Sequence, residues 1–241
     1  MSFEKFFGHD IDYSKAVSLW SWHHVLLSLF ALGSILITLK YAKRIKDSKY
    51  EKKIRYAFIG ILLFLEVTYH IHNWTYPRFS IPLNICSFAL FMLVYLLYTN
   101  DERIFRYAYF FGTLGGLMAL IIPTSLGYTY YNFRYYHFIV VHSVLIMIPI
   151  YYYKAYGFRV TYKDLLHVYL VTVSMTFILY LFNNTFGLNY WYINYIPINI
   201  DYLFKDYFTY VISWYVVVFT SMNLLYLLTI KKQPKDIVDF K

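Results

Sequence analysis

The stretch IRYAFIGILLFLEVTYHIHNW, residues 54–74, decides the class of fold. A helix needs about 20 mostly apolar residues to cross roughly 30 Å of hydrocarbon, and this stretch has that length. Apolar blocks of similar length recur along the chain, which is 60% hydrophobic and 15% charged. A soluble domain carries about 25% charged residues, so the sequence predicts a polytopic integral membrane protein instead of a soluble core.

We predict an all-α membrane protein, a single domain over residues 1–241 that forms a bundle of seven transmembrane helices. The expected spans are Ser18–Leu39, Ile54–Trp74, Ile81–Tyr98, Ile104–Ile122, Tyr135–Tyr153, Leu165–Phe182 and Tyr207–Leu228. The segment Asn183–Asp206 is too polar to span and is interpreted as an ordered loop or lid. Gly112, Gly115 and Gly116 give the fourth span a thin face that another helix can approach closely.

Lysine and arginine are distributed unevenly between alternate loops. Lys40–Arg55 holds eight of them, Thr99–Arg106 two, Lys154–Lys163 three and the C-terminal tail four, whereas the other loops hold five. Cytoplasmic loops carry the excess of basic residues, so we predict a multi-pass cell-membrane protein with its N-terminus outside and its C-terminus in the cytoplasm. This distribution accounts for the net charge of +9, and no nucleic-acid partner is expected. The richness in Tyr, Asn, Lys and Ile is typical of an AT-rich, bacterial genome.

Polar side chains gather in the outer half of the predicted spans. Glu66, His70 and Asn73 are spaced i, i+4, i+7 and therefore share one helix face. The other members of this group are His23, His24, Asn84, Cys86, His137, His142, Asn183 and Asn184. Ionisable groups within a span usually face a bundle interior or a water-filled cavity. The pattern therefore predicts a polar cavity that opens to the outer side.

Two kinds of chemistry fit these residues. Cys86 is the single cysteine of the chain, and its thiolate would be a nucleophile for acyl transfer if a base such as His142 took its proton. Alternatively, several histidines with Glu66 would bind zinc and leave a position open for water, but no HExxH motif is present, so we rank the metal second. Each residue also has a structural interpretation, because a buried cysteine is often a small hydrophobe and a membrane histidine an interhelical hydrogen-bond partner.

Several motifs, in the same order along the chain, resemble one family. IPLNICSF, YAYFFGTLGGLMALIIP and FRYYHFIVVHSVLIMIPIYYY lie within Ile81–Tyr153, NNTFGLNYWYINYIP covers Asn183–Pro197, and WSWHH precedes them. They resemble the YwaF-like integral membrane proteins, bacterial relatives of the transmembrane protein 164 family. The resemblance implies a compact bundle of six or seven helices.

The resemblance also implies an activity, because the eukaryotic branch is associated with acyl transfer between phospholipids through a Cys and a His in the membrane. By motif match these roles fall on Cys86 in PLNICS and His142 in VVHS. The chain departs from the family pattern at Asn84, where a His is usual, and at Ser87, where an Asp is usual. These departures leave fewer bases near Cys86.

The leading hypothesis is a membrane acyltransferase or transacylase that acts on glycerophospholipid acyl chains at the outer leaflet. Cys86 would be the nucleophile and His142 the base, while Glu66 and His70 orient and balance charge. Backbone N–H groups after Pro82 would stabilise the oxyanion. The expected substrate-binding residues are Asn84, His23, His24, His137, Asn184, Asn189 and Tyr190.

Membrane lipids are the expected partners, and neither a cofactor nor a metal is expected. Two other classes remain open at this point. One is a transporter or binding protein for a small polar solute that uses the same cavity. The other is a zinc-dependent membrane hydrolase that uses His23, His70 and His142.

Overall fold

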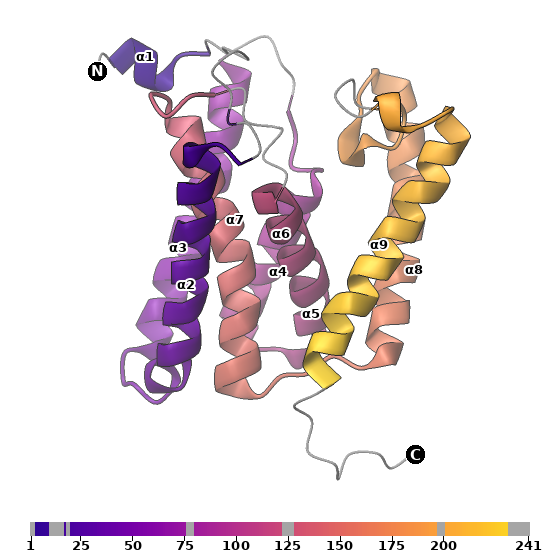
Figure 1. Cartoon of the computed structure of the whole chain (residues 1–241). Coiled ribbons are helices and arrows are strands. Elements are labelled where there is room, and N and C mark those ends of the chain that lie inside the picture. The colour runs from indigo at the N-terminus through magenta and orange to yellow at the C-terminus, as the bar shows by residue number, and fades with distance from the viewer. Residues whose placement is uncertain are drawn as a thin grey trace. The chain divides into compact units, whose positions relative to one another are not determined.

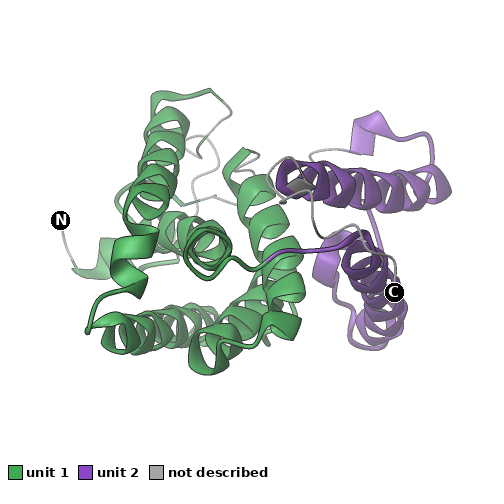
Figure 2. Cartoon of the chain, turned by 90° about the horizontal axis from the view of Figure 1, so that it is seen from below, with its two compact units in different colours: residues 1–158 green, residues 159–241 purple. Residues whose placement is uncertain are grey.

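The computed structural model describes residues 3–9, 17, 20–75, 80–121, 128–196 and 201–230, within which the regular structure is helical and no strand occurs. The chain divides into two compact units, residues 1–158 and 159–241 (Figure 2). Some predicted features lie outside the described residues: the first two residues of the span Ser18–Leu39, Ile122, Pro197 and the C-terminal tail.

Unit 1 is built from helices joined by turns (Figure 1). In chain order they are α1 (Phe3–Phe7), α2 (Trp22–Lys46), α3 (Glu51–Trp74), α4 (Ile85–Thr99), α5 (Glu102–Tyr107), the π-helical turn η2 (Ala108–Gly112), α6 (Thr113–Ile121), α7 (Phe133–Tyr151) and the π-helical turn η3 (Tyr152–Tyr156). The elements α5, η2 and α6 follow one another without a break and form a single span, Glu102–Ile121.

Short polar side chains mark where these helices begin. The Ser21 hydroxyl accepts a hydrogen bond from the backbone N–H of His24 at the start of α2. The Asn132 side chain accepts one from Arg134 N–H at the start of α7. Such caps satisfy backbone donors that have no partner within the helix, so the local sequence fixes the helix ends.

Six helices in the described part of the chain are long and apolar enough to cross a membrane, which confirms the all-α membrane fold. The third predicted span, Ile81–Tyr98, is instead the shorter helix α4. Its 15 residues extend over about 22 Å at 1.5 Å per residue, less than the hydrocarbon thickness. The helix starts late because Asn84 has extended backbone angles (φ −64°, ψ 148°), as does the typical residue before a helix.

The centre of unit 1 is formed by α7 and the span Glu102–Ile121, which are the most buried of its long helices. Gly112 and Gly116 explain why they pack closely. A Cβ atom on Gly112 would lie 2.8 Å from the backbone oxygen of Leu145, and one on Gly116 would lie 2.8 Å from that of His142. The prediction that these glycines form a face for close helix approach is confirmed for α7.

The peripheral helices α2 and α3 expose large apolar side chains such as Leu29, Leu36 and Phe64. Exposed apolar faces of this extent are expected where lipid is the solvent. Figure 1 shows the turn after α2 and the end of α7 at the same, lower end of unit 1. The basic segment Lys40–Arg55 contains this turn, and the basic segment Lys154–Lys163 begins just after the end of α7. The predicted orientation requires both segments to lie on the same side of the membrane.

Unit 2 contains α8 (Tyr162–Phe186), the 3-10 turns η4 (Tyr190–Tyr192) and η5 (Asp201–Leu203), and α9 (Tyr207–Ile230). Thr161 and Asp164 form a reciprocal capping box at the start of α8, which stabilises that end. The helix ends at Gly187, whose φ of +65° suits a residue without a Cβ. It therefore extends four residues beyond the predicted Phe182, and the loop begins later than expected.

Asp206 precedes α9 and accepts a hydrogen bond from Thr209 N–H at 2.7 Å. The bond favours the charged carboxylate, so it lowers the pKa of Asp206 below its usual value. The carboxylate is fully exposed and lies at the positive end of the helix, where a negative charge is favourable.

Candidate functional site

The polar face predicted on α3 is present and buried. Glu66 and His70 are 7% and 4% exposed, and Glu66 Oε1 lies 3.0 Å from His70 Nε2. A carboxylate within a membrane helix is costly unless it is paired. The imidazole one helical turn away supplies that partner, because residues four apart on a helix face each other.

The same network reaches Ser80, a residue that the sequence analysis did not single out. His70 Nδ1 lies 3.1 Å from Ser80 Oγ, and Asn73 Nδ2 donates to Ser80 Oγ at 3.2 Å. Trp74 Nε1 donates to the Ser80 carbonyl oxygen at 2.7 Å. Helical periodicity finds Glu66, His70 and Asn73, but Ser80 follows the end of α3, so no spacing rule connects it to them.

Cys86 occupies the first turn of α4 and is partly buried. Its Sγ lies 3.6 Å from the place that a Cβ on Gly115 would take. The carboxyl of Glu66 is near enough to interact electrostatically with the thiol. Among the described residues no hydrogen bond to Cys86 is formed, so the thiol is held by packing.

His142 lies in the middle of α7, 8% exposed, with its ring 4.2 Å from that of Phe138. Its Nδ1 lies 2.7 Å from the Phe138 carbonyl oxygen. A carbonyl accepts hydrogen bonds only, so Nδ1 carries the proton and Nε2 of the neutral ring keeps its lone pair. No described residue donates to or accepts from Nε2.

The two residues predicted as nucleophile and base border the same pair of glycines on α6. Cys86 packs against Gly115, and the His142 carbonyl lies over Gly116. No hydrogen bond joins Cys86 to His142 within the described part of the chain. The Cys86 side chain and the His142 backbone therefore pack against adjacent glycines of α6.

Three histidines predicted to bind substrate are engaged with protein groups. His24 accepts from Trp20 N–H through Nδ1 and lies 2.9 Å from the Leu120 carbonyl through Nε2. His137 Nε2 lies 2.8 Å from the Leu65 carbonyl, which ties α7 to α3. The ring of His23 stacks on Tyr130 with 5.1 Å between centroids. These contacts give each of the three a structural role.

The other predicted substrate-binding residues are Asn84 in unit 1 and three residues of unit 2. Asn84 is the N-cap of α4, but its side chain makes no cap hydrogen bond. Asn189 holds the loop together, accepting from Asn194 N–H at 2.9 Å and donating to the Tyr195 carbonyl at 3.0 Å. Tyr190 is buried, whereas Asn184 is exposed.

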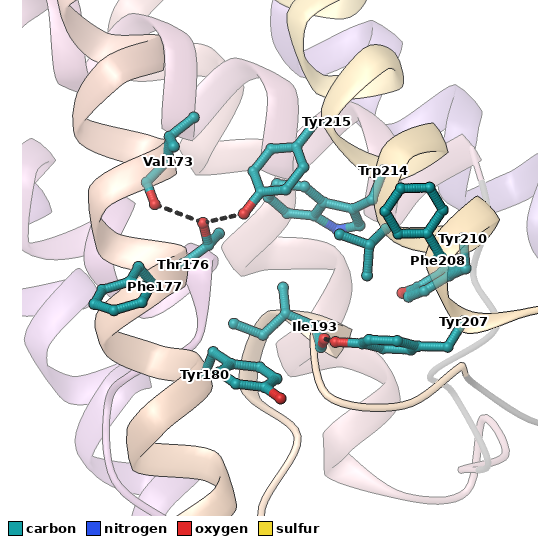
Figure 3. Close-up of a pocket in the computed structure, with 11 residues that line it drawn as sticks. Val173, Thr176, Phe177, Tyr180, Ile193, Tyr207, Phe208, Tyr210, Trp214 and Tyr215 are labelled. Carbon is teal, nitrogen blue, oxygen red and sulfur yellow. Dashed lines mark hydrogen bonds between the residues drawn. The ribbon is translucent and has the colours of Figure 1, made fainter.

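A cavity of about 400 Å³ lies within unit 2, between α8, α9 and the loop that connects them (Figure 3). Its wall is mostly aromatic and aliphatic, with one hydroxyl pair, Thr176 Oγ1 and Tyr215 OH, 2.7 Å apart. Tyr207 OH donates to the Ile193 carbonyl and so fastens the loop to the start of α9. The cavity is therefore lined largely by apolar groups.

Among the described residues, the histidines of unit 1 do not form a metal site with other ligands. In the described ranges no group of three or more His, Cys, Asp or Glu side chains lies close enough to hold a metal ion. The set required for a zinc hydrolase, His23, His70 and His142, is thus not assembled. Both His70 ring nitrogens are engaged, by Glu66 and Ser80, and His142 Nδ1 lies at the Phe138 carbonyl.

Comparison with known proteins gives one result. A family model described as the TMEM164 family matches residues 18–231, which is most of the chain. Neither the curated proteins nor the solved structures gave a match.

Proposed function

The chain belongs to the TMEM164 family, and we propose that it is a membrane acyltransferase that moves acyl chains between glycerophospholipids. Cys86 is the nucleophile and His142 the general base. The observation that carries this proposal is the hydrogen bond from His142 Nδ1 to the Phe138 carbonyl. It fixes the tautomer in which Nε2 is a free base within the membrane bundle.

The reaction has two steps. His142 Nε2 takes the thiol proton, and Sγ attacks the ester carbonyl carbon of a phospholipid. The carbon–oxygen bond breaks, the lysophospholipid leaves with the proton from His142, and the acyl chain stays on Cys86 as a thioester. The hydroxyl of a second lysophospholipid then attacks the thioester, giving up its proton, and restores the thiol.

Two features of unit 1 support this chemistry. Cys86 lies in the first turn of α4, where backbone N–H groups have no partner within the helix and are available to an oxyanion. Glu66 near the thiol would oppose a thiolate if it were unpaired, but it is paired with His70.

We assign the substrate to membrane lipid and the site to the outer leaflet of the cell membrane, following the predicted orientation. Asn84 faces no cap partner at the start of α4 and is the residue nearest in sequence to Cys86 that is available to a headgroup.

The test is transfer of a labelled acyl chain from phospholipid to lysophospholipid by purified protein in lipid nanodiscs. Cys86→Ser and His142→Gln are each expected to reduce the rate by about 100-fold or more, since each removes a group that acts in the chemical step. His167→Gln, an exposed change on α8, is the matched control and should transfer at the wild-type rate. Full transfer by Cys86→Ser would overturn the proposal.

A further inference from the structure

Glu66, His70 and Ser80 form a continuous chain from a carboxylate through an imidazole to a hydroxyl. Glu66 Oε1 lies 3.0 Å from one ring nitrogen of His70, and Ser80 Oγ lies 3.1 Å from the other. All three residues are buried, between 4% and 8% exposed. Nucleophile, base and orienting acid in this geometry define a catalytic triad, whatever their order in the sequence.

The direction of each hydrogen bond follows from the donors present. Asn73 Nδ2 can only donate, so it uses a lone pair of Ser80 Oγ at 3.2 Å. A carboxylate only accepts, so His70 Nε2 carries the hydrogen and donates it to Glu66. In the neutral ring Nδ1 then keeps its lone pair and accepts the hydrogen of the Ser80 hydroxyl. This is the arrangement that a base needs before it takes a proton from a hydroxyl.

Three other hydroxyls in the described spans have ordinary partners. Ser34 donates to the Phe30 carbonyl, Thr38 to the Ser34 carbonyl and Thr172 to the Val168 carbonyl, each within its own helix. Such bonds satisfy a polar group in an apolar medium and require no base. Ser80 instead points at an imidazole that is itself held by a carboxylate.

Asn73 completes the set. Its amide nitrogen lies 3.2 Å from Ser80 Oγ, next to the atom that would attack an ester. Asparagine amides are among the donors that stabilise the developing oxyanion in acyl transfer.

From this geometry we infer that Ser80 is a second nucleophile for carboxylic esters, activated by His70 and oriented through Glu66. His70 Nδ1 takes the Ser80 proton while Oγ bonds to the ester carbonyl carbon. The ester carbon–oxygen bond breaks, and the departing alcohol leaves with the proton from His70. Water or another alcohol then attacks the acyl-serine, releases an acid or a new ester, and returns a proton to Ser80.

This activity goes beyond the transfer proposed for Cys86 and His142, because no atom of either residue is required. The two sites share Glu66, which is hydrogen-bonded to His70 and lies within electrostatic range of Cys86. Variants at Ser80 and Cys86 therefore separate them: each should remove its own covalent adduct and leave the other.

The test is labelling of the full chain in nanodiscs with an alkyl fluorophosphonate, followed by intact-mass measurement and peptide mapping. Serine Oγ displaces fluoride from phosphorus, so an activated serine gains a stable phosphonyl adduct. We expect a single adduct at Ser80 in the wild type and in Cys86→Ala, and none in Ser80→Ala. His70→Gln should label at least about 100-fold more slowly, because the base is lost.

Ser34→Ala is the matched control, since it removes a membrane serine without an imidazole partner, and it should label like the wild type. An unlabelled wild type, or an adduct that maps to another residue, would overturn the inference. Peptide mapping of the wild type decides the matter even if Ser80→Ala does not fold. A wild type that forms the Ser80 adduct but no Cys86 thioester would contradict the proposed transferase and leave the inference about Ser80 intact.

Discussion

At the scale of single residues, the histidines of unit 1 differ in what their ring nitrogens contact. His24 has both nitrogens occupied, one by Trp20 N–H and one by the Leu120 carbonyl near the end of α6. His142 has one nitrogen occupied and the other available. Residues of the same type at similar depth therefore have different roles, which hydrogen-bond partners reveal and sequence position does not.

His24→Leu is expected to lower the free energy of unfolding by about 2 kcal/mol, because the buried Leu120 carbonyl and the partly buried Trp20 N–H lose their partner. His142→Gln should leave that free energy nearly unchanged, since its side-chain amide can still donate to the Phe138 carbonyl. Denaturant unfolding in detergent, followed by tryptophan fluorescence, measures both variants. Equal stability of His24→Leu and the wild type would contradict the structural role of His24.

The sequence predicted contacts within the candidate site only between residues of the same helix. The spacing of Glu66 and His70 predicts that they share a face, and they lie in contact. Ser80 could not be predicted, because its contact with His70 depends on how the chain returns after α3. Whether Cys86 and His142 share a reaction remains a prediction.

At the scale of elements, composition predicts that a helix is present more accurately than it predicts where that helix begins and ends. Apolar blocks of about 20 residues identify the long helices, because the bilayer sets that length. The late start of α4 at Ile85 and the extension of α8 to Phe186 depend on local backbone geometry at Asn84 and Gly187. Average hydropathy over a window does not predict these helix boundaries.

Gly116→Ala tests the contact between α6 and α7. The added Cβ would lie 2.7 Å from Ile146 Cγ1 and 2.8 Å from the His142 carbonyl, so the helices must move apart. We expect a loss of about 1–3 kcal/mol in the free energy of unfolding. Gly33→Ala in α2 is the control: nothing lies within 4 Å of its added Cβ, and it should gain up to about 1 kcal/mol. Similar results for the two variants would show that α6 and α7 are not in close contact.

Asn183→Ala tests the loop before α9. The Asn183 side chain donates to the Tyr190 carbonyl and to Asn194 Oδ1, and it accepts from Tyr190 N–H. Removing it should cost about 1–3 kcal/mol and should make the loop a site of limited proteolysis. Asn184→Ala, at the exposed neighbour, should resist protease like the wild type. Protection of Asn183→Ala at the wild-type level would show that the loop is held by other contacts.

At the scale of the whole molecule, the protein is a multi-pass member of the TMEM164 family whose described spans number six, with one shorter apolar helix. The charge distribution predicts that the polar residues of unit 1 lie toward the outer side of the membrane. An acyltransferase site there would meet lipid of the outer leaflet.

The orientation is tested with single cysteines in a Cys86→Ala background. Lys49→Cys lies in the basic turn after α2, and Tyr131→Cys lies in the exposed segment before α7. In intact cells a membrane-impermeant maleimide should label position 131 and not position 49, because basic loops face the cytoplasm. After permeabilisation both positions should be labelled. The reverse pattern in intact cells would place the polar site in the inner leaflet.

The most direct measurement of the central claim is the intact mass of the wild-type protein, purified with bound lipid, before and after neutral hydroxylamine. We predict an added acyl mass that hydroxylamine removes and that Cys86→Ser lacks, because hydroxylamine at neutral pH cleaves a thioester. A hydroxylamine-sensitive acyl mass that persists in Cys86→Ser would contradict acyl transfer through Cys86. A wild type without a hydroxylamine-sensitive adduct, even when supplied with excess phospholipid and no acceptor, would contradict it as well.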